Sequence, residues 1–236
     1  MNVQAPRRSD LPHGRSILTG LAKEHLSRFL QNATSVSLLK NQVLFKRGAP
    51  GDGCYWLRKG ILKVIVASPT GEERVLAILG PGSVVGELAV IDALPRSATV
   101  QGITDCQLTF VSGPAFKAWL QDNPEVYGHL VLTLVARLRQ ADEEIAAASF
   151  LTVNARIARA LIQLAEHFGQ PTGGGWVEIV HRIRQNDLAS MAGVARESVS
   201  RTLSDWGRQD IVSKRSPSHY VVHMETLQHE ATGSLR

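Results

Sequence analysis

Residues 185–207, QNDLASMAGVARESVSRTLSDWG, decide the fold of the C-terminal third of the chain. Small and apolar side chains recur at helical spacing on both sides of Gly193, and Asn186 is the expected cap of the first helix. Val199 and Leu203 are expected to face inward, because residues four apart lie on one face of a helix. Two helices that cross closely through a short glycine turn form a helix-turn-helix.

The outer face of the second predicted helix carries side chains that suit a DNA duplex. Arginine can bond both acceptors of a guanine, and glutamate can accept from a cytosine amine. Between His181 and Arg215, seven Lys and Arg outnumber four Asp and Glu, which favours phosphate contacts. A solvated helical hairpin is the competing interpretation, but the turn, the spacing and a trailing hairpin at residues 211–223 together favour double-stranded DNA. The predicted DNA contacts are Arg196, Glu197, Ser198, Ser200, Arg201 and, in the wing, Lys214.

A long helix is expected before this region, over residues 123–150. Asn123 is its expected N-cap, and Pro124 suits the first helical position. Apolar residues then recur at alternating steps of four and three, as in a coiled coil, with charged residues beside them. This pattern favours a homodimer seam, and the alternative is a helix that lies on its own domain's core. The seam residues are Tyr127, Val131, Leu134, Leu138, Ala141, Ile145 and Ala148.

Short strands with glycine punctuation are expected in the N-terminal half. They are predicted at residues 42–46, 54–58, 61–66, 74–79, 98–103 and 107–111. Many short strands at regular spacing are typical of a barrel or jelly roll. A helix at residues 17–30 is expected to pack against it. Between the long helix and the helix-turn-helix, an amphipathic stretch at 153–168 precedes a glycine-rich loop at 169–175 and a short segment at 176–180.

The composition fits a globular chain of two modest domains. Of 236 residues, 44% are hydrophobic, and the net charge of +5 permits a polyanionic partner. No apolar run reaches the 18–20 or so residues of a transmembrane helix, and no basic amphipathic stretch suggests a membrane surface. Residues 1–15 form a polar tail without the apolar core of a signal peptide. Cys54 and Cys106 stand alone, so a reducing cytoplasm is the expected compartment.

Residues 86–100, GELAVIDALPRSATV, form the candidate ligand-binding motif. Arginine with hydroxyl and backbone donors suits an anionic phosphate, and a carboxylate can accept from a sugar hydroxyl. By composition alone the motif is weak, because Glu87 and Arg96 could form an ordinary surface ion pair.

This motif and the helix-turn-helix together resemble the Crp/Fnr family of transcription regulators, over residues 17–222. GELAVIDALPRSATV resembles the phosphate-binding cassette of cyclic-nucleotide-binding domains. The resemblance implies that Arg96 and Ser97 hold the cyclic phosphate, that Glu87 binds the ribose 2′-hydroxyl and that Gly86 permits close approach. The sequence RESVSR resembles the family's recognition helix, which implies a TGTGA-type palindrome. RNA polymerase is the further partner that the family implies.

The chain departs from the family pattern where the base should bind. A Thr-Ser pair on the long helix contacts adenine in the family, and Ala141 and Asp142 stand there. A carboxylate can accept from guanine N1–H and its amine, whereas adenine N1 needs a donor. Asp142 could instead pair with Arg139, and cyclic AMP could rotate to present its N6 amine. The effector is therefore expected to be cyclic AMP, with cyclic GMP open. The complete predicted ligand site is Gly86, Glu87, Leu88, Arg96, Ser97, Ala98, Arg137, Ala141 and Asp142.

Four other functions compete with cyclic-nucleotide control. An iron–sulfur sensor needs more cysteines than the chain has. A haem sensor, with Cys54 or a histidine as ligand, stays open, as does a regulator without a ligand. An enzyme is not expected, because no nucleophile elbow occurs and the glycines at 48–53 do not open a helix after a strand. No metal site and no cofactor beyond the effector are expected.

The expected architecture is of the α+β class. It has a cyclic-nucleotide-binding β-roll (jelly roll) at residues 17–122, a central dimerisation helix at 123–151 and a winged helix-turn-helix at 152–236.

Overall fold

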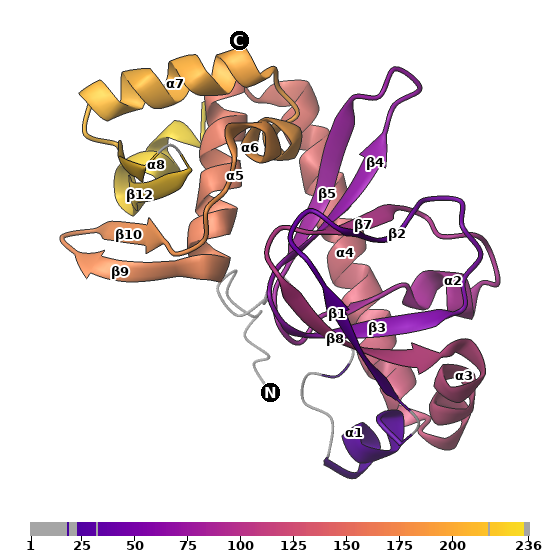
Figure 1. Ribbon diagram of the computed structural model, residues 1–236. Helices are drawn as coiled ribbons and strands as arrows, with labels where there is room; N and C mark the ends of the chain where they lie inside the picture. Colours follow the sequence, from indigo (N-terminus) through magenta and orange to yellow (C-terminus); the bar gives the residue numbers. More distant parts are fainter. Residues whose placement is uncertain (1–17, 19–22, 32, 217, 234–236) are drawn as a thin grey trace, which may run out of the picture. The chain divides into compact units, whose positions relative to one another are not determined.

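The computed structural model describes residues 18, 23–31, 33–216 and 218–233 (Figure 1). The chain divides into two compact units, residues 1–66 with 77–140 and residues 67–76 with 141–236. The expected polar tail at 1–15 and the start of the expected helix at 17–30 lie outside the described residues. Within the described residues, no helix is long and apolar enough to cross a membrane.

Two four-stranded sheets form the β-roll that the strand pattern predicts. One has the order β1-β8-β3-β6, and the other has the order β2-β7-β4-β5. In the first sheet, neighbouring strands are distant in sequence, as in a jelly roll: Val36 and Leu57 both lie opposite Leu108. The first sheet contains β1 (Thr34–Leu38), β3 (Gly53–Lys59), β6 (Val84–Val85) and β8 (Cys106–Ser112). The second contains β2 (Val43–Phe45), β4 (Leu62–Ala67), β5 (Glu73–Leu79) and β7 (Thr99–Gly102).

The core of the β-roll has two apolar clusters. One lies between the sheets and includes Leu57, Leu62 and Leu108, which are almost fully buried. The other joins strand β3 to the helices and includes Phe29 and Phe116, whose rings meet edge to face. Burying side chains of this size stabilises the fold by about 2 kcal/mol each.

Three short helices flank the roll, and the sequence predicted one of them. Helix α1 (Lys23–Phe29) falls within the expected helix. Helix α2 (Glu87–Ile91) is too short to show a helical period. Helix α3 (Gly113–Asp122) was also missed, although Ser112 caps it by accepting from the Ala115 amide at 3.4 Å.

The predicted cap at Asn123 is wrong. Asn123 ends α3, and the next helix, α4, spans Glu125–Phe150. The side-chain amide of Asn123 donates to the Trp119 carbonyl at 2.7 Å, and Asn123 Oδ1 contacts His25 Nδ1. The side chain of Asn123 is thus used to fasten α1 to α3, and not to cap α4.

Helix α4 has two apolar faces: one lies on the core of its own domain, and the other, which carries most of the predicted seam, is exposed in the single chain. Val126, Leu130 and Thr133 are buried against the roll, and Leu134 is partly buried there. The other face is exposed: relative exposure is 46% for Tyr127, 55% for Val131, 63% for Leu138 and 67% for Ile145.

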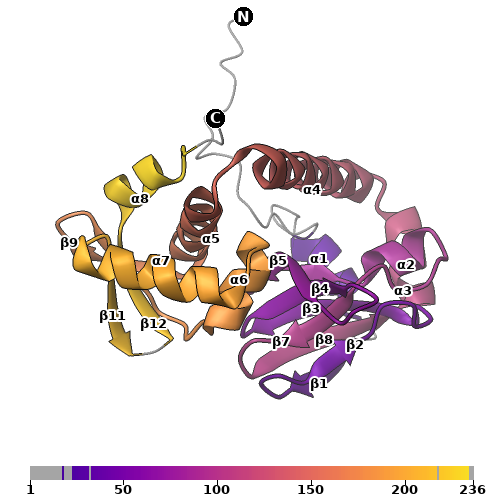
Figure 2. The same ribbon diagram turned by 90° about the horizontal axis from the view of Figure 1, so that it is seen from above.

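The second unit contains the winged helix-turn-helix. Helix α5 (Val153–Phe168) covers the amphipathic stretch seen in the sequence, and Thr152 caps it by accepting from the Ala155 amide at 3.2 Å. Its apolar face buries Ile157, Leu161 and Leu164. Helices α6 (Gln185–Ala192) and α7 (Arg196–Arg208) follow each other through a short turn (Figure 2). Helix α8 (Met224–Glu230) packs against α5.

The sheet of this unit has the order β11-β12-β10-β9. Its strands are β9 (Gly169–Gly173), β10 (Trp176–Ile179), β11 (Val212–Ser216) and β12 (His219–His223). The loop expected at 169–175 is therefore in large part a strand, because residues 169–173 pair with β10. Asn186 was also wrongly predicted to cap α6. The helix begins at Gln185, and Arg184 precedes it and pairs with Asp187 in the first turn at 2.9 Å.

Candidate functional site

The ligand motif begins at a glycine that the backbone requires. Gly86 lies in the left-handed region, with φ 85°, where α2 starts. A Cβ atom at this position would lie 2.3 Å from Arg96 Nη1. Only glycine therefore lets the guanidinium of Arg96 pack against this turn.

Arg96 is held as a buried cation. Its side chain is 1% exposed. Nη1 donates to the Gly86 carbonyl at 2.7 Å, and Nη2 donates to Asp52 Oδ1 at 2.7 Å. The guanidinium carbon lies 4.3 Å from the centre of the Phe45 ring, a cation–π contact. Nε is buried and has no hydrogen-bond partner among the described residues.

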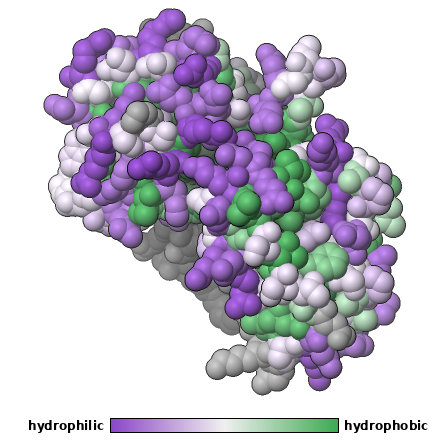
Figure 3. Space-filling model, in the orientation of Figure 1, coloured by the Kyte–Doolittle hydropathy of each residue, from purple (hydrophilic) through white to green (hydrophobic). Residues whose placement is uncertain are grey.

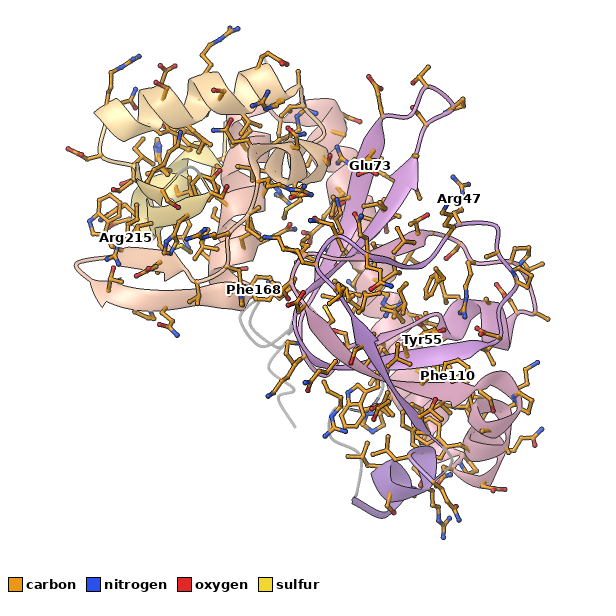
Figure 4. The ribbon with its side chains drawn as sticks, viewed as in Figure 1. Arg47, Tyr55, Glu73, Phe110, Phe168 and Arg215 are labelled. Atoms are coloured by element: carbon orange, nitrogen blue, oxygen red, sulfur yellow. The ribbon has the colours of Figure 1, made fainter. Side chains whose placement is uncertain are left out.

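A row of aromatic rings backs this cation. The Phe45 and Tyr55 ring centres are 6.0 Å apart, and those of Tyr55 and Phe110 are 5.0 Å apart. Figure 4 shows Tyr55 and Phe110 side by side on β3 and β8. Packed rings have little freedom to turn, so Tyr55 and Phe110 hold in place the Phe45 ring over which Arg96 lies.

Glu87 is the second charged group of the motif, and it is buried on α2. Arg137 of α4 donates to Glu87 Oε1 through Nη1 and to the Val84 carbonyl at 3.3 Å through Nη2. The negative charge is therefore compensated, as a buried carboxylate requires.

The structure gathers part of the predicted ligand site in the first unit. Gly86, Glu87, Arg96 and Arg137 share hydrogen bonds or close approaches, as described above. Leu88 is half-buried, Ser97 is exposed and Ala98 is buried. Ala141 and Asp142 are exposed on the part of α4 that belongs to the second unit.

Sequence reasoning missed two residues that touch Arg96, namely Asp52 and Phe45. Asp52 stands between Gly51 and Gly53, where the sequence pattern predicts only glycine punctuation between strands. An acidic residue between glycines was the available signal, but its partner lies 44 residues further on.

Hydrogen bonds within the turn and from α5 stabilise the helix-turn-helix. Gly193 ends α6 in the left-handed region, with φ 61°, as the sequence predicted. The Val194 amide donates to the Ala189 carbonyl at 3.1 Å. Arg156 of α5 donates to the Gly193 carbonyl at 3.0 Å, and Thr202 of α7 donates to Asn154 of α5 at 2.9 Å. Helix α5 thus supports both the turn and α7, a role that the sequence did not reveal.

Helix α7 separates an apolar face from a polar one. Val199 and Leu203 are buried, as predicted, together with Thr202 and Trp206. The surface over α7 is mostly hydrophilic in Figure 3. Of the predicted DNA contacts, Ser198 is half-buried, and the exposed ones are Arg196, Glu197, Ser200, Arg201 and, in β11, Lys214.

Cys54, on β3, is the cysteine that the sequence offers as a haem ligand. Cys54 is fully buried, and burial, followed by the charge of Glu87, raises the pKa of its thiol above the usual range. A thiolate at this position is therefore unfavourable. Among the described residues, no group of three or more His, Cys, Asp or Glu side chains could hold a metal ion.

The fold and site define a class of protein: a DNA-binding transcription regulator with a ligand-sensing β-roll. Residues 35–123 match the cyclic nucleotide-binding domain, and residues 155–230 match the Crp-like helix-turn-helix domain. The chain is 30% identical to the cyclic AMP receptor protein of Thermus thermophilus, over 84% of this chain and 88% of that protein. This chain therefore belongs to the CRP/FNR family of transcription regulators.

Two further proteins are similar. A CRP-like cAMP-activated global transcriptional regulator of Mycobacterium tuberculosis is 29% identical, over 91% of this chain and 96% of that protein. The structure of CLP from Xanthomonas campestris, a regulator described as c-di-GMP responsive, has a TM-score of 0.74 at 23% identity. The match covers 86% of this chain and 99% of the CLP chain. This last likeness concerns the fold alone.

Proposed function

We propose that this regulator is a homodimer that binds a cyclic nucleotide in the β-roll and a TGTGA-type palindrome through α7. The observation that carries the proposal is the buried guanidinium of Arg96, whose Nε has no partner among the described residues. A buried cation with a free donor, next to a buried carboxylate, suits a ligand that joins an anionic phosphate to a sugar hydroxyl.

The exposed face of α4 supports the homodimer. Tyr127, Val131, Leu138 and Ile145 are large apolar residues at the spacing of a coiled-coil seam, and each is exposed in the single chain. A parallel pair of such helices would place two α7 helices about 34 Å apart, one helical turn of DNA. This spacing fits a palindromic site.

The identity of the effector is inferred from the names of two relatives and from Asp142. Two relatives are named for cyclic AMP, which favours that nucleotide. Asp142 stands where the family pattern has a hydroxyl group, and this keeps cyclic GMP as the second candidate. A non-nucleotide effector such as haem is the alternative, and the buried thiol of Cys54 makes that residue a poor ligand for it.

Calorimetric titration of the full chain with cyclic AMP and cyclic GMP tests the proposal. We expect one of them to bind, and Arg96→Ala to weaken that binding at least about tenfold, because a charged hydrogen bond contributes about 1.5–3 kcal/mol. Circular dichroism checks that the variant is folded. Failure of both nucleotides to bind, or unchanged affinity in folded Arg96→Ala, would refute cyclic-nucleotide control. A visible absorption band of the purified protein would indicate haem instead.

A further inference from the structure

The solvent side of Arg96 is occupied by a carboxylate that belongs to the chain itself. Asp52 Oδ1 accepts from Arg96 Nη2 at 2.7 Å, and the two side chains differ sharply in exposure: 1% for Arg96 and 66% for Asp52. The cation is fixed in the interior by Gly86 and Phe45, whereas its anion reaches in from the surface. Asp52 is thus the solvent-exposed member of this pair, and it has room to turn away from the cation.

We propose that Asp52 is an internal competitor of the effector's phosphate, and that it sets the affinity of the site by holding Arg96 until an anion displaces it. This inference rests on the proposed function. A cyclic phosphate carries one negative charge and offers oxygen acceptors to the same guanidinium. A phosphate that binds the guanidinium side-on accepts from the unpartnered Nε and from Nη2 together, and Nη2 is the donor that Asp52 holds. The binding of one anion therefore weakens the binding of the other.

The surroundings of Asp52 allow its carboxylate to leave. Asp52 borders a hollow of about 750 Å³, which residues 48–52, residues 89–95 and the start of α3 line. A side chain that is two-thirds exposed regains its hydration when it turns toward this space, so the displacement costs little. The Gly86 carbonyl, in contrast, belongs to the backbone and stays on Nη1.

The carboxylate also has a function in the ligand-free protein. A buried guanidinium without a counter-ion is costly, and Asp52 supplies the charge that compensates Arg96. A phosphate that replaces Asp52 supplies that charge in turn. The inference therefore predicts opposite effects of one substitution: Asp52→Asn should destabilise the free protein and strengthen its binding of the nucleotide.

The experiment compares the wild type, Asp52→Asn and Asp122→Asn in the full chain. Asp122 is exposed at the end of α3 and is not among the residues described as partners of Arg96, so its substitution changes the net charge equally and serves as the matched control. Cyclic AMP and cyclic GMP are titrated by calorimetry, and thermal unfolding is followed without ligand. We expect Asp52→Asn to bind the nucleotide at least about fivefold more tightly than the other two proteins, and to unfold at a lower temperature without ligand.

Equal or weaker binding by Asp52→Asn would overturn the inference and would leave the proposed function standing. A purely structural role for Asp52 predicts this result, because it lowers stability and affinity together. Should Asp52→Asn not fold, Asp52→Ser removes the same charge and is judged in the same way.

Inorganic phosphate separates this inference from the proposed function. If neither nucleotide binds to any of the proteins, the proposed function fails. Thermal unfolding in millimolar phosphate then decides the inference by itself. Greater stabilisation of Asp52→Asn than of the wild type and Asp122→Asn would support the competition, and equal stabilisation of all three would overturn it.

Discussion

Arg137 of α4 donates a hydrogen bond to the buried carboxylate of Glu87 on α2, 50 residues away in the sequence. Glu87 is the residue that the family resemblance assigns to the ribose, so the candidate ligand site is joined to the long helix by a single ion pair. A ligand that competes for this carboxylate acts on α4 directly. It can shift a conformational equilibrium only as far as its affinities for the two states differ.

The Glu87–Arg137 pair should show energetic coupling. Arg137→Ala leaves the buried carboxylate without this partner and should cost about 1–2 kcal/mol, a value reduced because Arg137 is 40% exposed. Glu87→Gln removes the charge, so the double variant should be more stable than the sum of the two single effects by about 1 kcal/mol. Urea unfolding of the four proteins measures this, and strictly additive effects would contradict the pairing.

Helix α7 and the wing should differ in what they contribute to DNA binding. Arg196→Ala and Arg201→Ala should each cost about 1–3 kcal/mol on a TGTGA-type site and relax specificity there. Lys214→Ala should weaken binding to all sequences alike and reduce the salt slope by about one, because it loses a phosphate contact. Binding to specific and random duplexes at several salt concentrations separates the two effects.

Arg208 provides the control for this experiment. It is an exposed arginine on the same helix, paired with Asp205 at 2.5 Å, and it lies outside the predicted contacts. Arg208→Ala should change specific binding far less than Arg196→Ala. In the wing, Arg215, labelled in Figure 4, pairs with Glu178 at 3.2 Å. Substitution of Arg215 would also break this ion pair, so Lys214 is the residue to substitute. The same loss for all of these variants on both duplexes would show that recognition helix and wing are wrongly assigned.

The exposed face of α4 should hold the dimer together. Leu138→Asp places a charge in the predicted seam and should yield monomers with little affinity for the palindrome. Leu39→Asp is the matched control, since Leu39 is similarly exposed, at 67%, but lies outside α4. Sedimentation at micromolar concentration measures the state of each protein. A monomeric wild type would rule out the seam.

Asp142 should influence which base the site accepts. A carboxylate can accept two hydrogen bonds from guanine, whereas it repels the N1 lone pair of adenine. Asp142→Ser should therefore shift the ratio of affinities toward cyclic AMP by about tenfold, the lower part of a range of about 1–3 kcal/mol. Parallel titrations with cyclic AMP and cyclic GMP give this ratio. If the wild type binds cyclic AMP tightly and does not bind cyclic GMP, the predicted preference for guanine is wrong.

Tyr220 should make stability fall at high pH. Burial, followed by the charge of Asp187, raises its pKa from 10.0 to about 12, and its hydroxyl has no partner among the described residues. The folded state then retains a proton that the unfolded state loses, so this contribution is present below pH 10 and is lost between about pH 10 and 12.

Tyr220→Phe isolates this contribution. The variant should match the wild type to within about 1 kcal/mol at neutral pH, because it removes an unpaired hydroxyl. Across the alkaline range it should gain about 1–2 kcal/mol relative to the wild type. Urea unfolding at a series of pH values gives the difference, and parallel stability curves would contradict the raised pKa.

The sequence by itself determined the features that depend on near neighbours. The amphipathic pattern over residues 153–168 coincides with α5, and Gly193 with Val199 and Leu203 predicted the helix-turn-helix. In the cassette, Gly86, Glu87 and Arg96 follow one another within eleven residues. Helical spacing, a left-handed turn and a short motif are local properties, so they are visible in one stretch of chain.

Only the tertiary structure decided which distant groups meet. Asn123 has the sequence of a helix cap, yet its side chain is bound by His25, 98 residues away. Asp52 reaches Arg96 and Arg137 reaches Glu87 across 44 and 50 residues. In the first sheet of the roll, neighbouring strands are far apart in sequence, and the order β1-β8-β3-β6 brings the loop before β3 to the cassette. A buried charge takes the partner that packing places beside it, and packing depends on the whole fold.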